Sequence, residues 1–392
     1  MREELGRIKS MKVRETLAEL VRVDSVSARA NGEIISYARA RCEALGMSVR
    51  LFPYTDERGT EKLNMVAFAG PSSAGPADSP PEAELALVGH TDTVPYDPAW
   101  TGALSLTEHE GKLYGRGACD TKGFIAAALT AIGEIGTAGL RRPLALVLTA
   151  DEEVGCLGAK RLVRERALRA RYSIVGEPTS LRPMRAGKGY CLAEVTLRGR
   201  EGHSAYPALG ASAIFRAARL VARLERVAEE LRERDRQEAF EPPYTTLNVG
   251  LIKGGTAKNI IAGLCSFTLE WRPVPGQKAE YVLGLLRAAV EEERARDADF
   301  DCEIEVIRTD EGMETRADSR LVRLLEGLTG QQAGTIAFGT EAPQMIELGA
   351  EAVVLGPGDI RVAHRTGEYV PASELDQCVR VLSRAIEDFC LG

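Results

Sequence analysis

Several carboxylates and histidines stand just after apolar runs that are typical of β-strands. They are His90 with Asp92, Glu152 with Glu153, Glu177, and His364. Ligands of an open α/β sheet bind beyond the carboxyl ends of its strands, so these side chains are expected to meet at one edge. Histidine and carboxylate ligands without cysteine are the donor set of a hydrolytic zinc, cobalt or manganese site.

Most of these residues also have an ordinary explanation when each is taken alone. Asp120, in GRGACDTKG at the start of an expected helix, could be only an N-cap. Glu152 and Glu153 could be a solvated pair, and Glu177 a turn residue. The set is harder to dismiss, because three of the four histidines lie in glycine-containing turn sequences. Those three are His90, His203 and His364. His109 is expected in a surface hairpin and receives no role.

Neighbouring residues in these stretches can have different roles, one binding metal and the other orienting a ligand or transferring a proton. One ring nitrogen of His90 would bind a metal while Asp92 fixes the orientation and basicity of the imidazole. Glu153 would bind metal, and Glu152 would be the base that accepts a proton. Cys119 is an alternative nucleophile, but it has no histidine as a sequence neighbour, and the metal set already explains hydrolysis.

Composition limits the class of protein. A chain of 392 residues exceeds the usual size of one hydrophobic core, so two domains are expected. A net charge of -7 disfavours nucleic acid as a partner, and the arginine-rich run 161–172 is expected to be a solvated helix face. No apolar run approaches the roughly 20 residues of a membrane span.

Cysteine usage and the first segment favour the cytoplasm. The eight cysteines form no C-x-x-C pair, which suits reduced thiols better than disulfides or a sulfur-ligated zinc site. The opening sequence MREELGRIKSMKVRETL is charged and lacks the apolar core of a secretory signal.

Apolar runs that alternate with helical patterns predict an α/β fold, with a mixed, largely parallel sheet flanked by helices. The clearest runs are 84–90, 144–153, 172–178 and 351–358. Helices are expected at 32–45, 122–135 and 374–390, the last with Ser373 as N-cap. A loop is expected at 71–83. This catalytic domain would comprise residues 1–185 and 308–392.

The pattern changes between residues 186 and 307, which are expected to form an inserted ferredoxin-like α+β domain. Its order is a strand at 190–198, a helix at 212–236, strands at 245–253 and 259–272, then a helix and a strand. This is the split βαβ arrangement.

Six motifs are similar to those of the co-catalytic zinc amidohydrolases and exopeptidases. This group includes acetylornithine deacetylase, succinyl-diaminopimelate desuccinylase, aminoacylase and glutamate carboxypeptidase. The motifs occur in the family's order, and the resemblance extends from about Arg14 to Phe389. They are GHTDTVP, GRGACDTKG, TADEEVG, GEPT, GREGHSAYP and GPGDIRVAH. The resemblance implies a zinc-exopeptidase-like catalytic domain.

The resemblance also implies a pair of divalent metal ions, with zinc expected first and cobalt or manganese as alternatives. One ion would be held by His90 and Glu177, the other by Glu153 and His364, and Asp120 would bridge both. In the family this aspartate precedes a cis peptide, which here would join residues 120 and 121.

The mechanism that the family implies is attack of a metal-activated water on an amide carbonyl. Glu152 would accept the proton of that water and pass it to the leaving amine. His203, on the inserted domain, resembles the histidine that relatives deliver to the oxyanion, often across a dimer interface. The inserted domain would then be a lid that also forms a homodimer. The alternative is that His203 is a turn residue before Pro207.

The substrate is expected to be a small N-acyl amino acid. Asn259 and Arg272 match family positions that hold the substrate, and Arg272 could grip an α-carboxylate or instead form a surface ion pair. Glu341 could meet a substrate ammonium group or act as a helix cap.

Three stretches favour N-acetyl-L-ornithine, hydrolysed to L-ornithine and acetate in arginine biosynthesis. They are GEPTSLRPMRAGKG, EAFEPPYTTLNVG and FGTEAPQM. The enzymatic alternatives are succinyl-diaminopimelate desuccinylation and an aminoacylase or dipeptidase activity. A metal-bound carrier or regulatory protein is the alternative of another class, and the presence of Glu152 argues against it.

Overall fold

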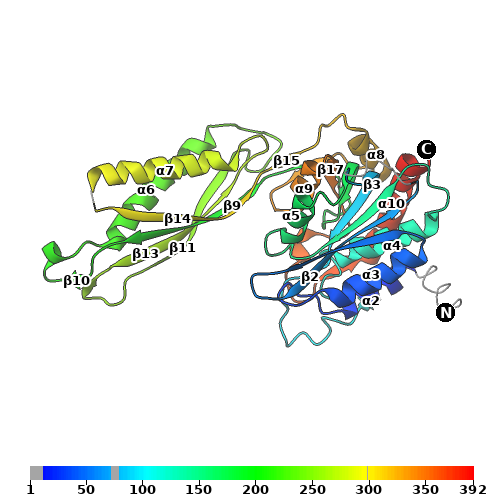
Figure 1. Ribbon diagram of the computed structural model, residues 1–392, viewed down its shortest axis with the longest axis horizontal. Coiled ribbons are helices and arrows are strands. Elements are labelled where there is room, and N and C mark those ends of the chain that lie inside the picture. The colour runs from blue at the N-terminus through cyan, green and yellow to red at the C-terminus, as the bar shows by residue number, and fades with distance from the viewer. Residues whose placement is uncertain (1–11, 72–78, 298) are drawn as a thin grey trace. The chain divides into compact units, whose positions relative to one another are not determined.

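The computed structural model describes residues 12–71, 79–297 and 299–392, which form two compact units (Figure 1). Unit 2 comprises Ala186–Glu314 and Thr335–Gly339, and unit 1 comprises the rest of the chain. The inserted segment was expected to end at residue 307, but that position lies inside strand β14 (Asp301–Asp310). Most of the expected loop at 71–83 lies outside the described residues.

Unit 1 contains a mixed sheet. In spatial order its strands are β1 (Ser48–Thr55), β2 (Glu61–Ala69), β6 (Leu144–Thr149), β3 (Glu82–His90), β7 (Arg169–Val175), β17 (Glu351–Val354) and β8 (Met184–Gly187). Strands β6, β3, β7 and β17 are mutually parallel, and antiparallel strands flank them on both sides. The last residues of β8 belong to unit 2 and pair there with the short strand β15 (Met313–Glu314). The short strand β16 (Gly334–Ile336) also pairs with β8. The largely parallel sheet is as predicted.

Helices cover both faces of this sheet, which explains why its central strands are apolar throughout. One core cluster joins the sheet to α2 (Val13–Arg22), α3 (Gly32–Ala44), α4 (Lys122–Ile135), α8 (Arg320–Thr329) and α10 (Ala372–Ile386). Leu85 and Leu87 of β3 point into that cluster, whereas the alternate residues Ala86 and Val88 are buried outside it. The helices α5 (Leu157–Arg164) and α9 (Ala342–Glu347) pack together away from this cluster (Figure 1).

Two predicted element boundaries in unit 1 are wrong. The strand expected at 144–153 ends at Thr149, so the following acidic residues lie in a turn. Ser373 is not the N-cap of the last helix, because α10 begins at Ala372 directly after Pro371. Pro371 still belongs to β18 (Tyr369–Pro371), which pairs with β5 (Lys112–Tyr114) and ends only where the helix starts. β5 also pairs with β4 (Thr107–His109), so the expected hairpin is present.

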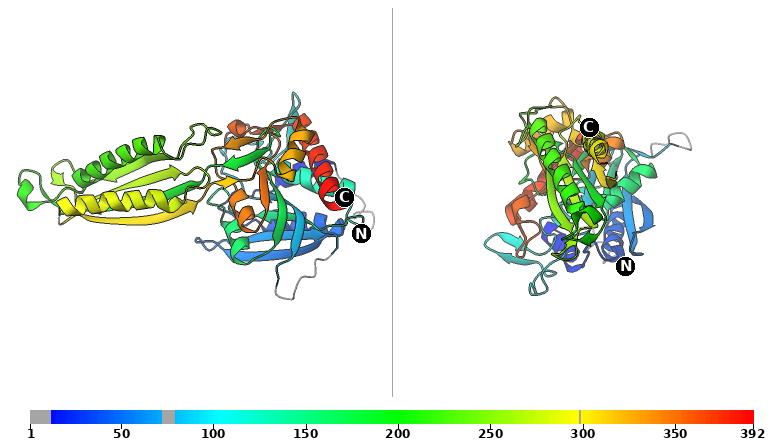
Figure 2. Two further views of the ribbon diagram at one scale, coloured as in Figure 1. Left: turned by 90° about the horizontal axis from the view of Figure 1, so that it is seen from above. Right: turned by 90° about the vertical axis from the view of Figure 1, so that its left-hand side faces the viewer.

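Unit 2 is a four-stranded antiparallel sheet with two helices (Figures 1 and 2). Across the sheet the strands are β11 (Thr246–Gly254), β13 (Leu264–Arg272), β9 (Tyr190–Arg198) and β14 (Asp301–Asp310). The helices α6 (Ala213–Arg232) and α7 (Ala279–Arg296) lie side by side along one face of this sheet. The chain order gives the predicted split βαβ arrangement.

Two details of unit 2 differ from expectation. The helix expected at 212–236 starts at Ala213 and ends at Arg232, with Ser212 as its N-cap: the Ser212 hydroxyl accepts the N–H of Phe215 at 3.3 Å. The strand expected at 259–272 is split into β12 (Ile260–Ile261), which pairs with β10 (Gly202–His203), and β13. Within the described ranges, no helix has both the length and the apolar character needed to cross a membrane.

Candidate metal centre

Parallel strand register places the expected ligands at one edge of the sheet of unit 1. His90 is the last residue of β3 and is paired with Thr149, the last residue of β6. Glu152 and Glu153 follow β6 within one turn, and Glu177 follows β7. His364 follows β17 after a short 3-10 turn. Residues far apart in sequence therefore share one end of the parallel strands.

Asp120 is the centre of the observed contacts. Its Oδ1 lies 3.1 Å from Nε2 of His90, and its Oδ2 lies 3.1 Å from Nε2 of His364. The same nitrogen of His364 lies 3.1 Å from Oε1 of Glu153. Potential ligand atoms of His90, Asp120 and Glu153 all lie within 4.8 Å of one another. One carboxylate oxygen faces each imidazole, which is the arrangement expected of a bridging ligand.

Glu177 is buried close to the same carboxylates, with 4 % of its surface exposed. Burial raises its pKa well above the ordinary value, and the charges of Asp120 and Glu152 raise it further. The preceding residue must be small, because a Cβ at Gly176 would lie 2.2 Å from the ring of Phe124. The glycine of the GEPT motif thus lets β7 approach α4, the helix that begins beside Asp120.

The electrostatics of the cluster favour a bound cation. Burial raises the pKa of Glu152 to about 8, although the charge of His90 opposes it. Burial also raises the pKa of Glu153. Contacts with Asp120 and Glu153 raise the pKa of His364 to about 10. Desolvated carboxylates that repel one another are stabilised by a divalent ion, and these residues fit one.

The donor atoms also fit a divalent metal of the zinc, cobalt or manganese type, because they are imidazole nitrogens and carboxylate oxygens. Cys119 belongs neither to the donor set nor to a nucleophilic mechanism. Its thiol is buried and donates to the carbonyl of Asp359 at 3.7 Å. Burial raises the thiol pKa well above its ordinary value, so no thiolate is available.

The main chain, and not the carboxylate, of Asp92 orients His90. Nδ1 of His90 donates to the backbone carbonyl of Asp92 at 2.9 Å, whereas the carboxylate Oδ1 is 3.7 Å away. This contact assigns the proton to Nδ1 and leaves Nε2 free to bind a metal. The expected support of the imidazole is therefore present, but it comes from a different group of the same residue.

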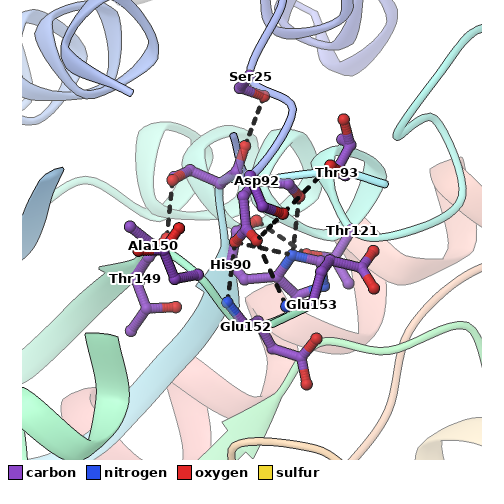
Figure 3. Close-up of polar contacts among 12 residues, drawn as sticks. Ser25, His90, Asp92, Thr93, Thr121, Thr149, Ala150, Glu152 and Glu153 are labelled. Carbon is purple, nitrogen blue, oxygen red and sulfur yellow. Dashed lines mark hydrogen bonds and ion pairs between the residues drawn. The ribbon is translucent and has the colours of Figure 1, made fainter. Parts of the chain in front are cut away.

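The carboxylate of Asp92 instead holds the turn that contains the adjacent glutamates. It accepts the backbone N–H of Glu152 at 3.1 Å and that of Glu153 at 3.3 Å, and both amides face it in Figure 3. The hydroxyl of Ser27 donates to the same carboxylate at 2.7 Å. Asp92 thus fixes both the candidate base and one candidate ligand.

The structure also contains the expected cis peptide between Asp120 and Thr121. The hydroxyl of Thr121 donates to the backbone carbonyl of His90 at 3.1 Å, so the loop that carries one candidate ligand is tied to the strand that carries another (Figure 3).

Two groups of buried residues around the centre were not predicted. Lys62 pairs with Asp151 at 2.8 Å and donates to the carbonyls of Ser27 and Arg29. Glu368 is fully buried beside the loop of Asp120. A sequence signal existed for Glu368 alone, because it is an acidic residue four positions after His364, the last candidate ligand.

The remaining expected residues of unit 2 are more exposed. His203 in β10 is exposed, and its Nδ1 accepts the N–H of Ala205 at 3.1 Å. Asn259 is also exposed. Arg272 contacts Glu270 at 2.8 Å and the carbonyl of Ala337 at 2.8 Å. Part of the Arg272 guanidinium is therefore already occupied, as the ion-pair alternative expected.

Glu341 is buried in unit 1, with 1 % of its surface exposed. It occupies the N-cap position of α9, but its side chain makes no capping hydrogen bond. Among the described residues, its Oε1 has no hydrogen-bond partner. Burial raises the pKa of Glu341 to about 7, against the charge of His90. A buried carboxylate oxygen without a partner, close to the centre, is suited to receive a cationic group of a ligand.

Comparisons with known sequences agree with this geometry. A family model described as peptidase family M20/M25/M40 matches residues 86–388. An acetylornithine deacetylase from Myxococcus xanthus is 57% identical over 381 residues, which cover 97% of this chain and 98% of the relative. An acetylornithine deacetylase from Proteus mirabilis (strain HI4320) is 35% identical over 389 residues, covering 96% and 97%.

Solved structures share the fold. A tripeptidase from Staphylococcus aureus superposes with a TM-score of 0.74 at 23% identity, covering 95% of this chain and 96% of the other. An M20 family metallo-carboxypeptidase from Sulfolobus solfataricus gives a TM-score of 0.72 at 20% identity, covering 94% and 97%. At these identities the likeness is evidence for the architecture alone.

Proposed function

The chain belongs to peptidase family M20/M25/M40, and from that membership we propose that it hydrolyses N-acetyl-L-ornithine to L-ornithine and acetate. It is an enzyme of the amidohydrolase type, as its relatives are. The observation that carries the substrate assignment is the 57% identity to a deacetylase of that name over almost the whole of both chains. The buried cluster of histidines and carboxylates is consistent with a metal-dependent reaction.

We propose that a pair of divalent ions, zinc first, occupies this cluster. His90 and Glu177 would hold one ion, Glu153 and His364 the other, and Asp120 both. When bound, such ions polarise the amide carbonyl and lower the pKa of water towards neutrality. The contacts of Asp120 with both imidazoles support this division of ligands.

Glu152 is proposed as the residue that moves the proton. Its carboxylate is buried beside His90 and Glu153, and its Oε1 accepts a hydrogen bond from the thiol of Cys156, a weak donor, at 3.4 Å. It can therefore take a proton from the attacking water and release it to the amine that leaves. Cations bound at the neighbouring carboxylates would bring its raised pKa back towards neutrality.

Glu341 is proposed to recognise the side-chain ammonium of the ornithine group. Replacing it with glutamine is expected to lower kcat/KM for N-acetyl-L-ornithine by about 10- to 100-fold, since hydrogen bonds to charged groups contribute about 1.5 to 3 kcal/mol. N-acetyl-L-methionine carries no ammonium group there and serves as the control, because its kcat/KM should change little. Equal losses on the two substrates would contradict this role.

His203 is proposed to stabilise the oxyanion that forms during amide hydrolysis. Replacing it with alanine is expected to lower kcat by about 10²- to 10³-fold, the usual effect of losing one such donor. The metal content, measured by mass spectrometry, should be unchanged, because His203 lies in unit 2 and outside the ligand set. A variant with wild-type kcat would support the alternative that His203 is only a turn residue.

Asn259 and Arg272 remain the proposed substrate contacts in unit 2, with Arg272 as the anchor for the α-carboxylate. Arg272 lies over the ring of Tyr190, with 4.5 Å to the ring centroid, and this stacking orients its guanidinium. Its contacts with Glu270 and Ala337 engage only part of its five donors.

A homodimer formed through unit 2 is also proposed. Unit 2 exposes large apolar side chains, among them Phe215 at 71% and Leu251 at 62%. Sedimentation velocity should show a dimer, and a monomer at micromolar concentration would contradict the proposal.

A place in arginine biosynthesis follows from the proposed substrate. The eight free, buried cysteines favour the cytoplasm as the compartment.

The substrate assignment is tested by initial rates on N-acetyl-L-ornithine, N-succinyl-diaminopimelate and N-acetyl-L-methionine, measured side by side with zinc or cobalt. The first is expected to be hydrolysed with the highest kcat/KM. Faster hydrolysis of the succinyl compound would move the assignment to desuccinylation, and a preference for the methionine derivative would move it to an aminoacylase.

A further inference from the structure

Glu368 holds the loop that carries Asp120 through three backbone hydrogen bonds. Its Oε1 accepts the N–H of Cys119 at 2.9 Å and the N–H of Asp120 at 3.1 Å. Its Oε2 accepts the N–H of Gly117 at 3.0 Å. The residue is fully buried, at 0% exposure, so these are interior contacts that water does not replace.

Arg116 supplies the counter-charge that makes this burial possible. Its guanidinium donates to Oε2 of Glu368 at 2.6 Å, and only 3% of the Arg116 side chain is exposed. The same guanidinium donates to the carbonyl of Pro95 at 3.3 Å and lies over the ring of Trp100. Arg116 therefore neutralises Glu368 and also anchors the pair to the segment that follows β3.

The main chain reinforces this connection. The N–H of Gly115 donates to the carbonyl of Glu368 at 3.1 Å, and the next residue, Tyr369, pairs with Tyr114 in the ladder between β18 and β5. The loop between β5 and α4 is thus fastened to the segment that carries His364. That loop contains Asp120, so two proposed ligands depend on one buried carboxylate for their relative position.

We infer that Glu368, neutralised by Arg116, is a positioning residue that fixes Asp120 relative to the His364 segment and thereby sets the affinity of the centre for metal. The inference rests on the proposed function only in requiring that the cluster binds a divalent ion. A carboxylate is needed because all four partners of Glu368 are donors and both of its oxygens only accept. Glutamine has the same shape but presents an NH2 group to N–H donors.

The experiment compares zinc and cobalt binding by the metal-free full chain with Glu368 intact and with Glu368→Gln. We expect the dissociation constant, measured by chelator competition, to rise by about 10- to 100-fold, as it does when a group supporting a ligand is lost. The visible absorption of bound cobalt should also change, because the ligand field depends on where Asp120 lies. Glu368→Asp, which keeps the charge, should recover part of the affinity.

A matched control separates positioning from general loss of a buried ion pair. Glu293 in unit 2 is buried at 3% exposure and pairs with Arg219 at 2.7 Å and Arg296 at 3.0 Å. Glu293→Gln should lower the unfolding temperature while leaving the metal dissociation constant and the cobalt spectrum unchanged. If Glu368→Gln behaved in the same way, the positioning role would be overturned.

A milder substitution covers the case in which Glu368→Gln does not fold. Arg116→Lys keeps the positive charge but cannot reach Glu368 and Pro95 with one planar group. It should raise the metal dissociation constant severalfold, and an unchanged constant would overturn the inference. These measurements need no substrate, so failure of the ornithine assignment would leave them intact. Wild-type protein that bound no divalent ion would overturn both proposals.

Discussion

Replacing Glu152 with glutamine is expected to lower kcat for N-acetyl-L-ornithine by about 10²- to 10⁴-fold, the usual contribution of a general base. The amide has nearly the same volume, but it cannot accept the proton of the attacking water. The backbone N–H of residue 152 would still donate to the carboxylate of Asp92, so the turn that also carries Glu153 should keep its shape. KM is expected to change much less than kcat.

Metal content and a matched substitution make this result interpretable. The Glu152→Gln protein should bind as much metal as wild type, because the proposed ligands are untouched. Glu134→Gln, on the exposed face of α4, should leave kcat unchanged. A Glu152→Gln enzyme with wild-type kcat would remove the basis for the proposed mechanism and favour a carrier or regulatory protein.

Removal of divalent metal with a chelator is expected to abolish hydrolysis and to lower the unfolding temperature. The carboxylates of Asp120, Glu153 and Glu177 would then face one another at a largely buried site without a cation. Ions present at 100 times their dissociation constant stabilise the native state by about 2.7 kcal/mol per site, so their loss should be visible in a thermal scan.

Dialysis followed by addition of zinc, cobalt or manganese should restore both activity and unfolding temperature. Chelator already saturated with zinc is the control for effects of the chelator itself, and it should change neither quantity. Full activity in chelator, together with a metal content near zero by mass spectrometry, would contradict a metal-dependent reaction.

The sheet of unit 1 could be predicted because its central strands are covered on both faces and are therefore apolar without alternation. The apolar run that starts at residue 144 continues without a turn signal into acidic residues, so the pattern predicts a longer strand than β6. The strand ends at Thr149 because the carboxylate of Asp92, distant in sequence, captures the next turn. A contact between residues distant in sequence produces no pattern in the local sequence from which the end of the strand could be predicted.

The candidate ligands could be proposed from the sequence because each stands beyond an apolar run or at a helix start within a short motif. The groups that support them were harder to anticipate. Glu368 acts through backbone N–H groups, which every residue type except proline supplies, so the sequence of the loop gives no hint of its partner. Residues 335–339 belong to unit 2, although the residues before and after them in the sequence belong to unit 1. A prediction that assigns each domain from continuous stretches of sequence cannot find so short a segment.

His364 is the last proposed ligand in the chain, and the strands that carry most of the others come much earlier. A chain that lacked the segment after β17 would therefore present an incomplete set of ligands, so full metal affinity requires β3, β6, β7 and β17 to be assembled in one sheet.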